Sequence, residues 1–166
     1  MNLIIHPIPP VCSRNPETPP RVLILGSFPS VKSRETSFFY GHPQNRFWRV
    51  LAAVLNVPVP QTVPEKITML EGHGIALWDV IASCTVTGSA DSSIRDVTPT
   101  DLSSVLSGGT IRAVFTNGGT ASRMYETYQA PATKISAIPL PSTSPANAAW
   151  SIDRLTEAWS VIRNYL

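Results

Sequence analysis

Two stretches of the sequence carry side chains suited to holding phosphates and aromatic rings. The first spans residues 26–48, beginning Gly-Ser-Phe-Pro-Ser and ending Tyr-Gly-His-Pro-Gln-Asn-Arg-Phe-Trp. Ser30 and Lys32 offer a hydroxyl and a positive charge to a phosphate. The aromatic run that ends at Tyr40 could stack on a base drawn out of a helix. Composition alone favours the alternative that these aromatic residues complete the hydrophobic core.

The second stretch reads Leu-Pro-Ser-Thr-Ser-Pro-Ala-Asn over residues 140–147 and leads into a helix-like segment. The free N–H groups and the dipole of a helix N-terminus both favour an anion. Ser142, Thr143 and Ser144 are therefore candidates for holding a phosphate, with Asn147 beside them. The alternative is ordinary helix capping by Ser144 or Asn147.

A third candidate is the turn Phe-Thr-Asn-Gly-Gly over residues 115–119. The amide of Asn117 both donates and accepts, so it could read the edge of a base, or it could simply shape the turn. Three aspartates are further candidates for acid–base chemistry, but a solvated turn or a helix cap is the favoured interpretation for each: Asp79, Asp91 and Asp96.

Short apolar segments alternate with segments of helical periodicity. The predicted strands are 21–26, 74–80, 112–116 and 134–140. The predicted helices are 45–55, 64–71, 100–106, 119–128 and an amphipathic helix at 147–165. This alternation predicts an α/β fold, a three-layer αβα sandwich around a four-stranded parallel sheet. Ligands bind at the carboxyl ends of the strands in such sheets, which is where all three candidate loops lie.

Composition limits the class of protein. The chain has 166 residues, of which 43% are hydrophobic, so we expect one domain over residues 1–166 with a proline-rich lead-in at 1–20. A net charge of +2 leaves any attraction to nucleic acid to a local patch. Cys12 and Cys84 are too few for a disulfide framework or a four-cysteine metal site, and we expect no metal or cofactor. No apolar run approaches the roughly 20 residues of a membrane helix, so we expect a soluble, cytoplasmic monomer.

These segments together resemble the uracil-DNA glycosylase superfamily over roughly residues 22–147. Residues 40–48 are similar to the stretch of mismatch-specific uracil glycosylases in which an aromatic residue and His-Pro precede Asn-Arg-Phe-Trp. Residues 26–30 and 142–147 are similar to the first and second active-site motifs of the superfamily. The detailed pattern resembles the hypoxanthine-DNA, or deoxyinosine, glycosylase branch.

The resemblance implies roles for individual residues. Tyr40 matches the aromatic that stacks on an extruded base, and residues 142–144 match the loop that grips phosphates. Many members align the attacking water with Asn or Asp where this chain has Phe28, and carry His or Asn where it has Ser142. In the hypoxanthine branch the asparagine of the His-Pro-x-Asn segment serves instead, which implies that Asn45 is the catalytic residue.

Glycosidic cleavage passes through an oxocarbenium-like sugar and a negatively charged leaving base. Asn45 could hold a water with its carbonyl or bond the base with its amide, while Tyr40 and Phe28 sandwich the ring. Asn117 and Ser142, or backbone N–H groups, would bind a hypoxanthine. His42 could donate to the base as well, or it could have a purely structural role before Pro43.

We therefore expect an enzyme that removes a deaminated base, hypoxanthine above all, from double-stranded DNA and leaves an abasic site; single-stranded DNA is a second candidate substrate. One alternative is a glycosylase acting on uracil or thymine mispairs. The other is a non-catalytic α/β module that binds damaged DNA, with Phe28 marking lost activity. No Gly-x-Ser-x-Gly elbow and no Gly-x-x-x-x-Gly-Lys loop is present, which argues against a serine hydrolase and a nucleotide hydrolase.

Overall fold

The computed structural model describes residues 2–87 and 93–166. Its centre is a parallel sheet of four strands in the order β3-β2-β6-β7. The strands are β2 (Val22–Gly26), β3 (Ile75–Asp79), β6 (Ala113–Asn117) and β7 (Ala137–Leu140). All five residues of β2 are buried, as expected for an apolar strand in the middle of a sheet covered on both faces. The predicted four-stranded parallel sheet is thereby confirmed.

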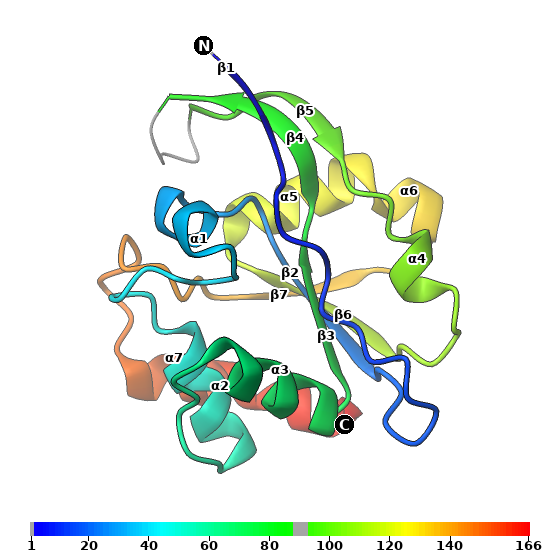
Figure 1. Cartoon of the computed structure of the whole chain (residues 1–166), viewed down its shortest axis with the longest axis vertical. Coiled ribbons are helices and arrows are strands. Elements are labelled where there is room, and N and C mark those ends of the chain that lie inside the picture. Colours follow the sequence, from blue (N-terminus) through cyan, green and yellow to red (C-terminus); the bar gives the residue numbers. More distant parts are fainter. Residues whose placement is uncertain (1, 88–92) are drawn as a thin grey trace.

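Helices cover both faces of this sheet, as the sequence predicted (Figure 1). One face carries α2 (Phe47–Leu55), α3 (Val63–Gly72) and α7 (Ile152–Trp159), which is followed by the 3₁₀ helix η2 (Ser160–Tyr165). The other face carries α4 (Ser103–Leu106), α5 (Gly119–Tyr128) and α6 (Ala130–Thr133). Each layer has its own buried cluster. Trp159 of α7 packs edge-on against Phe47 of α2, with 5.7 Å between the ring centroids.

A second sheet was not predicted from the sequence. It is antiparallel, in the order β1-β4-β5, and consists of β1 (Asn2–Ile5), β4 (Ile81–Val86) and β5 (Arg95–Pro99). Its strands are short and partly polar, and β5 is mostly exposed, so they lack the apolar runs that mark the central strands. Asp96 lies on β5 and accepts a 3.0 Å hydrogen bond from the Thr85 hydroxyl, whereas Asp91 lies outside the described residues.

The lead-in over residues 1–20 is an integral part of the fold. After β1 it runs beside β3, where Val11 forms an antiparallel bridge with Leu77, and Ile8 is only 3% exposed. This path carries residues near the N-terminus to the edge of the parallel sheet. The prolines of the segment therefore shape an ordered chain with fixed contacts to β3.

Several helices differ from the predictions: α6 was not predicted, and α4 begins at Ser103 rather than at residue 100. A short helix, α1 (Val31–Thr36), was not predicted; Ser30 caps it by accepting a 3.2 Å hydrogen bond from the Ser33 N–H. The last helix begins at Ile152 rather than at residue 147, because Ser151 caps it and accepts a 3.1 Å bond from the Arg154 N–H. Capping by Ser144 or Asn147 is therefore the wrong interpretation. Within the described ranges, no helix has the length and apolar character to cross a membrane.

Candidate active site

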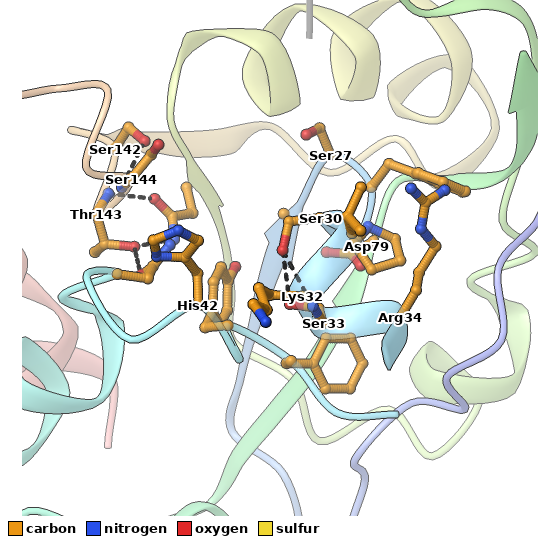
Figure 2. Close-up of a pocket in the computed structure, with 18 of the residues that line it drawn as sticks. Ser27, Ser30, Lys32, Ser33, Arg34, His42, Asp79, Ser142, Thr143 and Ser144 are labelled. Carbon is orange, nitrogen blue, oxygen red and sulfur yellow. Dashed lines mark hydrogen bonds between the residues drawn. The ribbon is translucent and has the colours of Figure 1, made fainter. Parts of the chain in front are cut away.

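A pocket of about 400 Å³ opens at the carboxyl edge of the parallel sheet, within the size range of small-molecule sites. In the view of Figure 2, residues 142–144 lie on one side of it, α1 lies on the other, and His42 lies between them. Among the predicted site residues, those that line the pocket are Phe28, Ser30, Lys32, Tyr40, His42, Asn45, Asn117, Ser142, Thr143 and Ser144. Asn147 does not line it; its amide instead donates to the Ser142 carbonyl at 3.0 Å.

Three of these residues form a hydrogen-bonded chain that ties three loops together. The Thr143 hydroxyl donates to Asn45 Oδ1 at 2.9 Å and accepts from Asn117 Nδ2 at 3.0 Å. The Thr143 N–H donates to Asn117 Oδ1 at 3.1 Å. Thr143 is 0% exposed, so its side chain is not available to a phosphate, and the expected phosphate contact is not supported at this residue. Asn117 uses both ends of its amide within the protein.

Asn45 is oriented by the start of α2. Its Oδ1 accepts a second hydrogen bond, of 2.9 Å, from the Phe47 N–H. A backbone N–H can only donate, so this contact identifies the oxygen end of the amide. With two donors already on the oxygen, the Nδ2 group is the end of Asn45 that makes no hydrogen bond to a described residue.

Tyr40 stacks on the core rather than standing free. Its ring lies 4.1 Å from that of Phe47 with 22° between the planes, so only the opposite face of Tyr40 is open to a base. The residue has a left-handed φ of 52°. Its hydroxyl is buried and has no hydrogen-bond partner among the described residues. Burial, and secondly the charge of Asp79, raise the pKa of Tyr40 far above its ordinary value, which keeps the hydroxyl neutral.

Asp79 was interpreted from the sequence as a solvated turn or cap residue, and the structure shows this to be wrong. It is 3% exposed and lines the pocket. Its Oδ2 accepts a 2.8 Å hydrogen bond from His6 Nε2. His6 Nδ1 in turn accepts from the Ile8 N–H at 3.1 Å, so Nε2 carries the ring proton and His6 is a neutral donor. The position of Asp79 at the carboxyl end of β3 was a usable signal, but nothing in the sequence indicated His6.

The sequence analysis gave no role to Arg46. In the structure this residue holds in place the loop that follows β7, which we call the second loop (residues 141–151). Its guanidinium donates to the carbonyls of Ser144 at 2.9 Å and Asn147 at 3.0 Å, and also to that of Trp150. Within that loop the Ser142 hydroxyl accepts from the Ser144 N–H at 3.1 Å. The fork geometry of arginine suits this role, since one side chain meets several carbonyls.

The opposite side of the pocket carries two basic side chains, Lys32 and Arg34. Lys32 is exposed on α1 and pairs with Glu35 at 3.3 Å, and the Arg34 guanidinium lies 5.8 Å from the centroid of the Phe28 ring. His42 Nδ1 accepts a 3.0 Å hydrogen bond from the Gln44 N–H, which gives it a turn role and leaves Nε2 as a donor. The described residues contain no cluster of three His, Cys, Asp or Glu side chains that could hold a metal ion.

Comparisons with known proteins agree with this architecture. The family model described as the uracil DNA glycosylase superfamily matches residues 14–163. A hypoxanthine DNA glycosylase of Methanosarcina acetivorans is 33% identical over 98% of this chain and 100% of its own length. A hypoxanthine DNA glycosylase of Methanosarcina barkeri is 35% identical over 53% of this chain and 54% of its own.

A solved structure gives the same result for the fold. The solution NMR structure of a Methanosarcina acetivorans protein described as a candidate uracil DNA glycosylase has a TM-score of 0.79 and 30% sequence identity, covering 98% of this chain and 99% of the other. The family match spans both candidate loops and the whole parallel sheet. This chain therefore belongs to the uracil DNA glycosylase superfamily.

Proposed function

We propose that this chain hydrolyses the N-glycosidic bond of hypoxanthine in DNA and leaves an abasic site, without a cofactor. The observation that carries the proposal is the meeting of the two motif loops at one pocket, where Thr143 joins its loop to Asn45. The names of the two Methanosarcina relatives support hypoxanthine as the base. Substrate DNA would place the damaged nucleotide in this pocket after it swings out of the helix.

Asn45 is the proposed catalytic residue. Its Oδ1 is already occupied by the Thr143 hydroxyl and the Phe47 N–H, so the geometry favours a role for the Nδ2 group over water binding by the carbonyl. An N–H donor fixed in advance toward the leaving base stabilises the negative charge that develops there. No general base is needed to make the bond break, because the sugar carries the opposite charge in the transition state.

The remaining pocket residues would bind and orient the nucleotide. Phe28 and the open face of Tyr40 offer apolar surfaces to the ring, and the Ser142 hydroxyl and His42 Nε2 offer polar contacts to its edge. Ser30 and Lys32 at one rim and Ser144 at the other are the proposed phosphate contacts. We expect the enzyme to act as a monomer.

The proposal is tested by base release from an oligonucleotide carrying one deoxyinosine, in duplex and single-stranded form, run with wild type and with Asn45→Ala. Wild type should release hypoxanthine and leave an alkali-labile site. Asn45→Ala should lose about 100-fold or more of the single-turnover rate while it still unfolds cooperatively. Matched duplexes with uracil or xanthine rank the bases. Binding to the inosine duplex without any cleavage would instead support a non-catalytic module.

A further inference from the structure

Tyr40 holds a backbone conformation that tyrosine rarely adopts. Its φ of 52° lies in the left-handed region, where the Cβ atom of a bulky residue is crowded by the backbone. A strained residue of this kind persists only where its surroundings hold it, and such residues gather at functional sites. The Tyr40 hydroxyl makes no hydrogen bond to a described residue. The groups that hold the residue must therefore act on its ring or on the peptide groups beside it.

Two buried side chains bind the peptide groups on either side of Tyr40. On one side, the Ser33 hydroxyl accepts a 3.0 Å hydrogen bond from the Gly41 N–H. On the other side, Trp48 Nε1 donates a 3.2 Å hydrogen bond to the Phe39 carbonyl. Ser33 is 2% exposed and Trp48 is 6% exposed, so water competes poorly for both bonds. The segment 39–41, which we call the tyrosine turn, is thus bound at both ends.

Glycine at position 41 allows α1 to lie against the tyrosine turn. A Cβ atom at Gly41 would lie 2.5 Å from Thr36 Oγ1 and 3.4 Å from the Lys32 carbonyl oxygen, so a larger residue there would push the helix away. The Ser33 hydroxyl also accepts a 3.2 Å hydrogen bond from the Ser30 hydroxyl at the start of α1 (Figure 2). The two donors on its oxygen fix the orientation of the Ser33 side chain.

The position of the Tyr40 ring depends on this backbone conformation. A change of φ to the ordinary negative range would rotate the Cα–Cβ bond and move the ring away from Phe47, on which it lies at 4.1 Å. The face of Tyr40 turned away from Phe47 is the one that the proposed function offers to the extruded base. A ring that is already in place before DNA arrives avoids the cost of ordering it in the complex.

Resting on the proposed function, we propose that Ser33 and Trp48 are positioning residues, which hold Tyr40 in its left-handed conformation so that its ring is in place to stack on the extruded base. Neither side chain needs to touch the base in this role. The helix α1 then serves two parts of the substrate, because Lys32 on its exposed side is a proposed phosphate contact and Ser33 on its buried side positions the ring.

A fluorine label on the tyrosines tests the position of the Tyr40 ring without any DNA. The chain has four tyrosines, and 3-fluorotyrosine places a fluorine on each; the Tyr40 resonance is the one that Tyr40→Phe removes. Its chemical shift reports the stacking on Phe47, because an aromatic ring shifts the resonances of atoms over its face. In Ser33→Ala and in Trp48→Phe this resonance should move or broaden as the ring leaves Phe47. An unmoved resonance in either variant overturns the role of the residue that was changed.

Matched variants separate these two bonds from a general loosening of the fold. Ser33→Thr keeps the hydroxyl and should restore the wild-type resonance. Trp78→Phe removes a bond of the same kind, the 3.2 Å hydrogen bond from Trp78 Nε1 to the Ile8 carbonyl, and Ser104→Ala makes the serine change at an exposed site on α4. Both should leave the Tyr40 resonance where it is in wild type. An equal shift in these two controls would mean that any loosening moves the ring, which contradicts the proposal.

Excision kinetics test whether the ring position matters to the reaction. Ser33→Ala should lower the single-turnover rate on an inosine duplex about tenfold at saturating enzyme, since the base meets a ring that is out of place. Its affinity for an undamaged duplex should stay within about twofold of wild type, because the phosphate contacts remain. Ser33→Thr should recover the rate. A displaced Tyr40 resonance together with the wild-type rate in Ser33→Ala would refute the link between ring position and excision.

The two proposals fail in different ways. Should wild type release no hypoxanthine from an inosine duplex, the proposed function is wrong, and the fluorine spectra still decide whether Ser33 and Trp48 hold the ring. Should wild type release hypoxanthine while the Tyr40 resonance of both variants coincides with that of wild type, the enzyme stands and only the positioning role falls.

Discussion

The Thr143 hydroxyl donates a 2.9 Å hydrogen bond to Asn45 Oδ1 across 98 residues of sequence. This one contact joins the loop after β2 to the loop after β7. Thr143 is fully buried, so water cannot replace the bond. The orientation of the Asn45 amide in the pocket therefore depends on a residue that does not itself need to touch DNA.

Replacing Thr143 with valine should slow excision without abolishing it. Valine keeps the shape but leaves the Asn117 amide without its hydroxyl acceptor, at a cost of about 1–3 kcal/mol in the free energy of unfolding. We expect the single-turnover rate to fall about tenfold as Asn45 loses one of its two constraints. Thr143→Ser, which keeps the hydroxyl, is the control. A Thr143→Val enzyme as fast as wild type would remove Thr143 from the positioning of Asn45.

Asn45→Asp distinguishes the two ends of the Asn45 amide. Aspartate can still accept from the Thr143 hydroxyl and the Phe47 N–H, but it offers no N–H to the base. If Nδ2 contacts the leaving base, Asn45→Asp should lose about as much rate as Asn45→Ala, on the order of 100-fold. The measurement is the single-turnover rate on an inosine duplex. Retained activity in Asn45→Asp would favour the carbonyl and a bound water.

Arg46→Lys should loosen the second loop. One ammonium group cannot reach all three carbonyls, which belong to Ser144, Asn147 and Trp150. We expect a loss of about 2 kcal/mol in the free energy of unfolding and slower excision, measured by urea denaturation and single-turnover kinetics. Arg49→Lys, at an exposed site on α2, the helix that follows Arg46, should change neither. Equal stability of the two variants would contradict the assigned role.

Lys32→Ala tests the phosphate contact on α1. If Lys32 neutralises one phosphate, the logarithm of the association constant for DNA should depend less steeply on the logarithm of the salt concentration in Lys32→Ala than in wild type, by about 0.9 in slope. The change should be the same for damaged and undamaged duplexes. Arg112→Ala is the control, since Arg112 is exposed next to the start of β6, at the opposite end of the parallel strands. Identical salt slopes for Lys32→Ala and wild type would show that Lys32 faces solvent in the complex.

Tyr40→Phe should change how stability depends on pH. The raised pKa of Tyr40 means that the folded protein keeps the proton while the unfolded chain releases it above about pH 10. The stability that this group contributes is present below that pH and is lost as the pH rises further. In Tyr40→Phe the free energy of unfolding should fall less at alkaline pH than it does in wild type. At neutral pH, removal of the unpartnered hydroxyl should raise the free energy of unfolding by about 1 kcal/mol.

Urea denaturation at pH 7 and at pH 10.5 or so measures both effects for Tyr40→Phe. Tyr128→Phe, at a side chain that is 43% exposed, is the matched control and should behave as wild type does. If Tyr40→Phe and wild type lose the same free energy of unfolding between the two pH values, another group controls stability in that range.

Local sequence patterns were sufficient for the central sheet. Segments such as residues 22–26 are apolar at every position because they are covered on both faces, and a strand of that kind reads as a continuous apolar run. The second sheet escaped prediction for the same reason: β1 and β5 are largely exposed. The helix α1 is only six residues long, too short to show a periodic pattern.

The sequence by itself determined which loops meet at the pocket, since strands that run parallel bring their carboxyl ends to one edge. It also predicted most of the residues that line the pocket, Asn45 among them. Only the tertiary structure decided that Thr143 is an internal link, that Arg46 holds a loop, and that His6 bonds Asp79 from 73 residues away. The physical reason is that periodicity records which face of a segment is buried. The partner of a buried polar group is set instead by how distant segments close on one another.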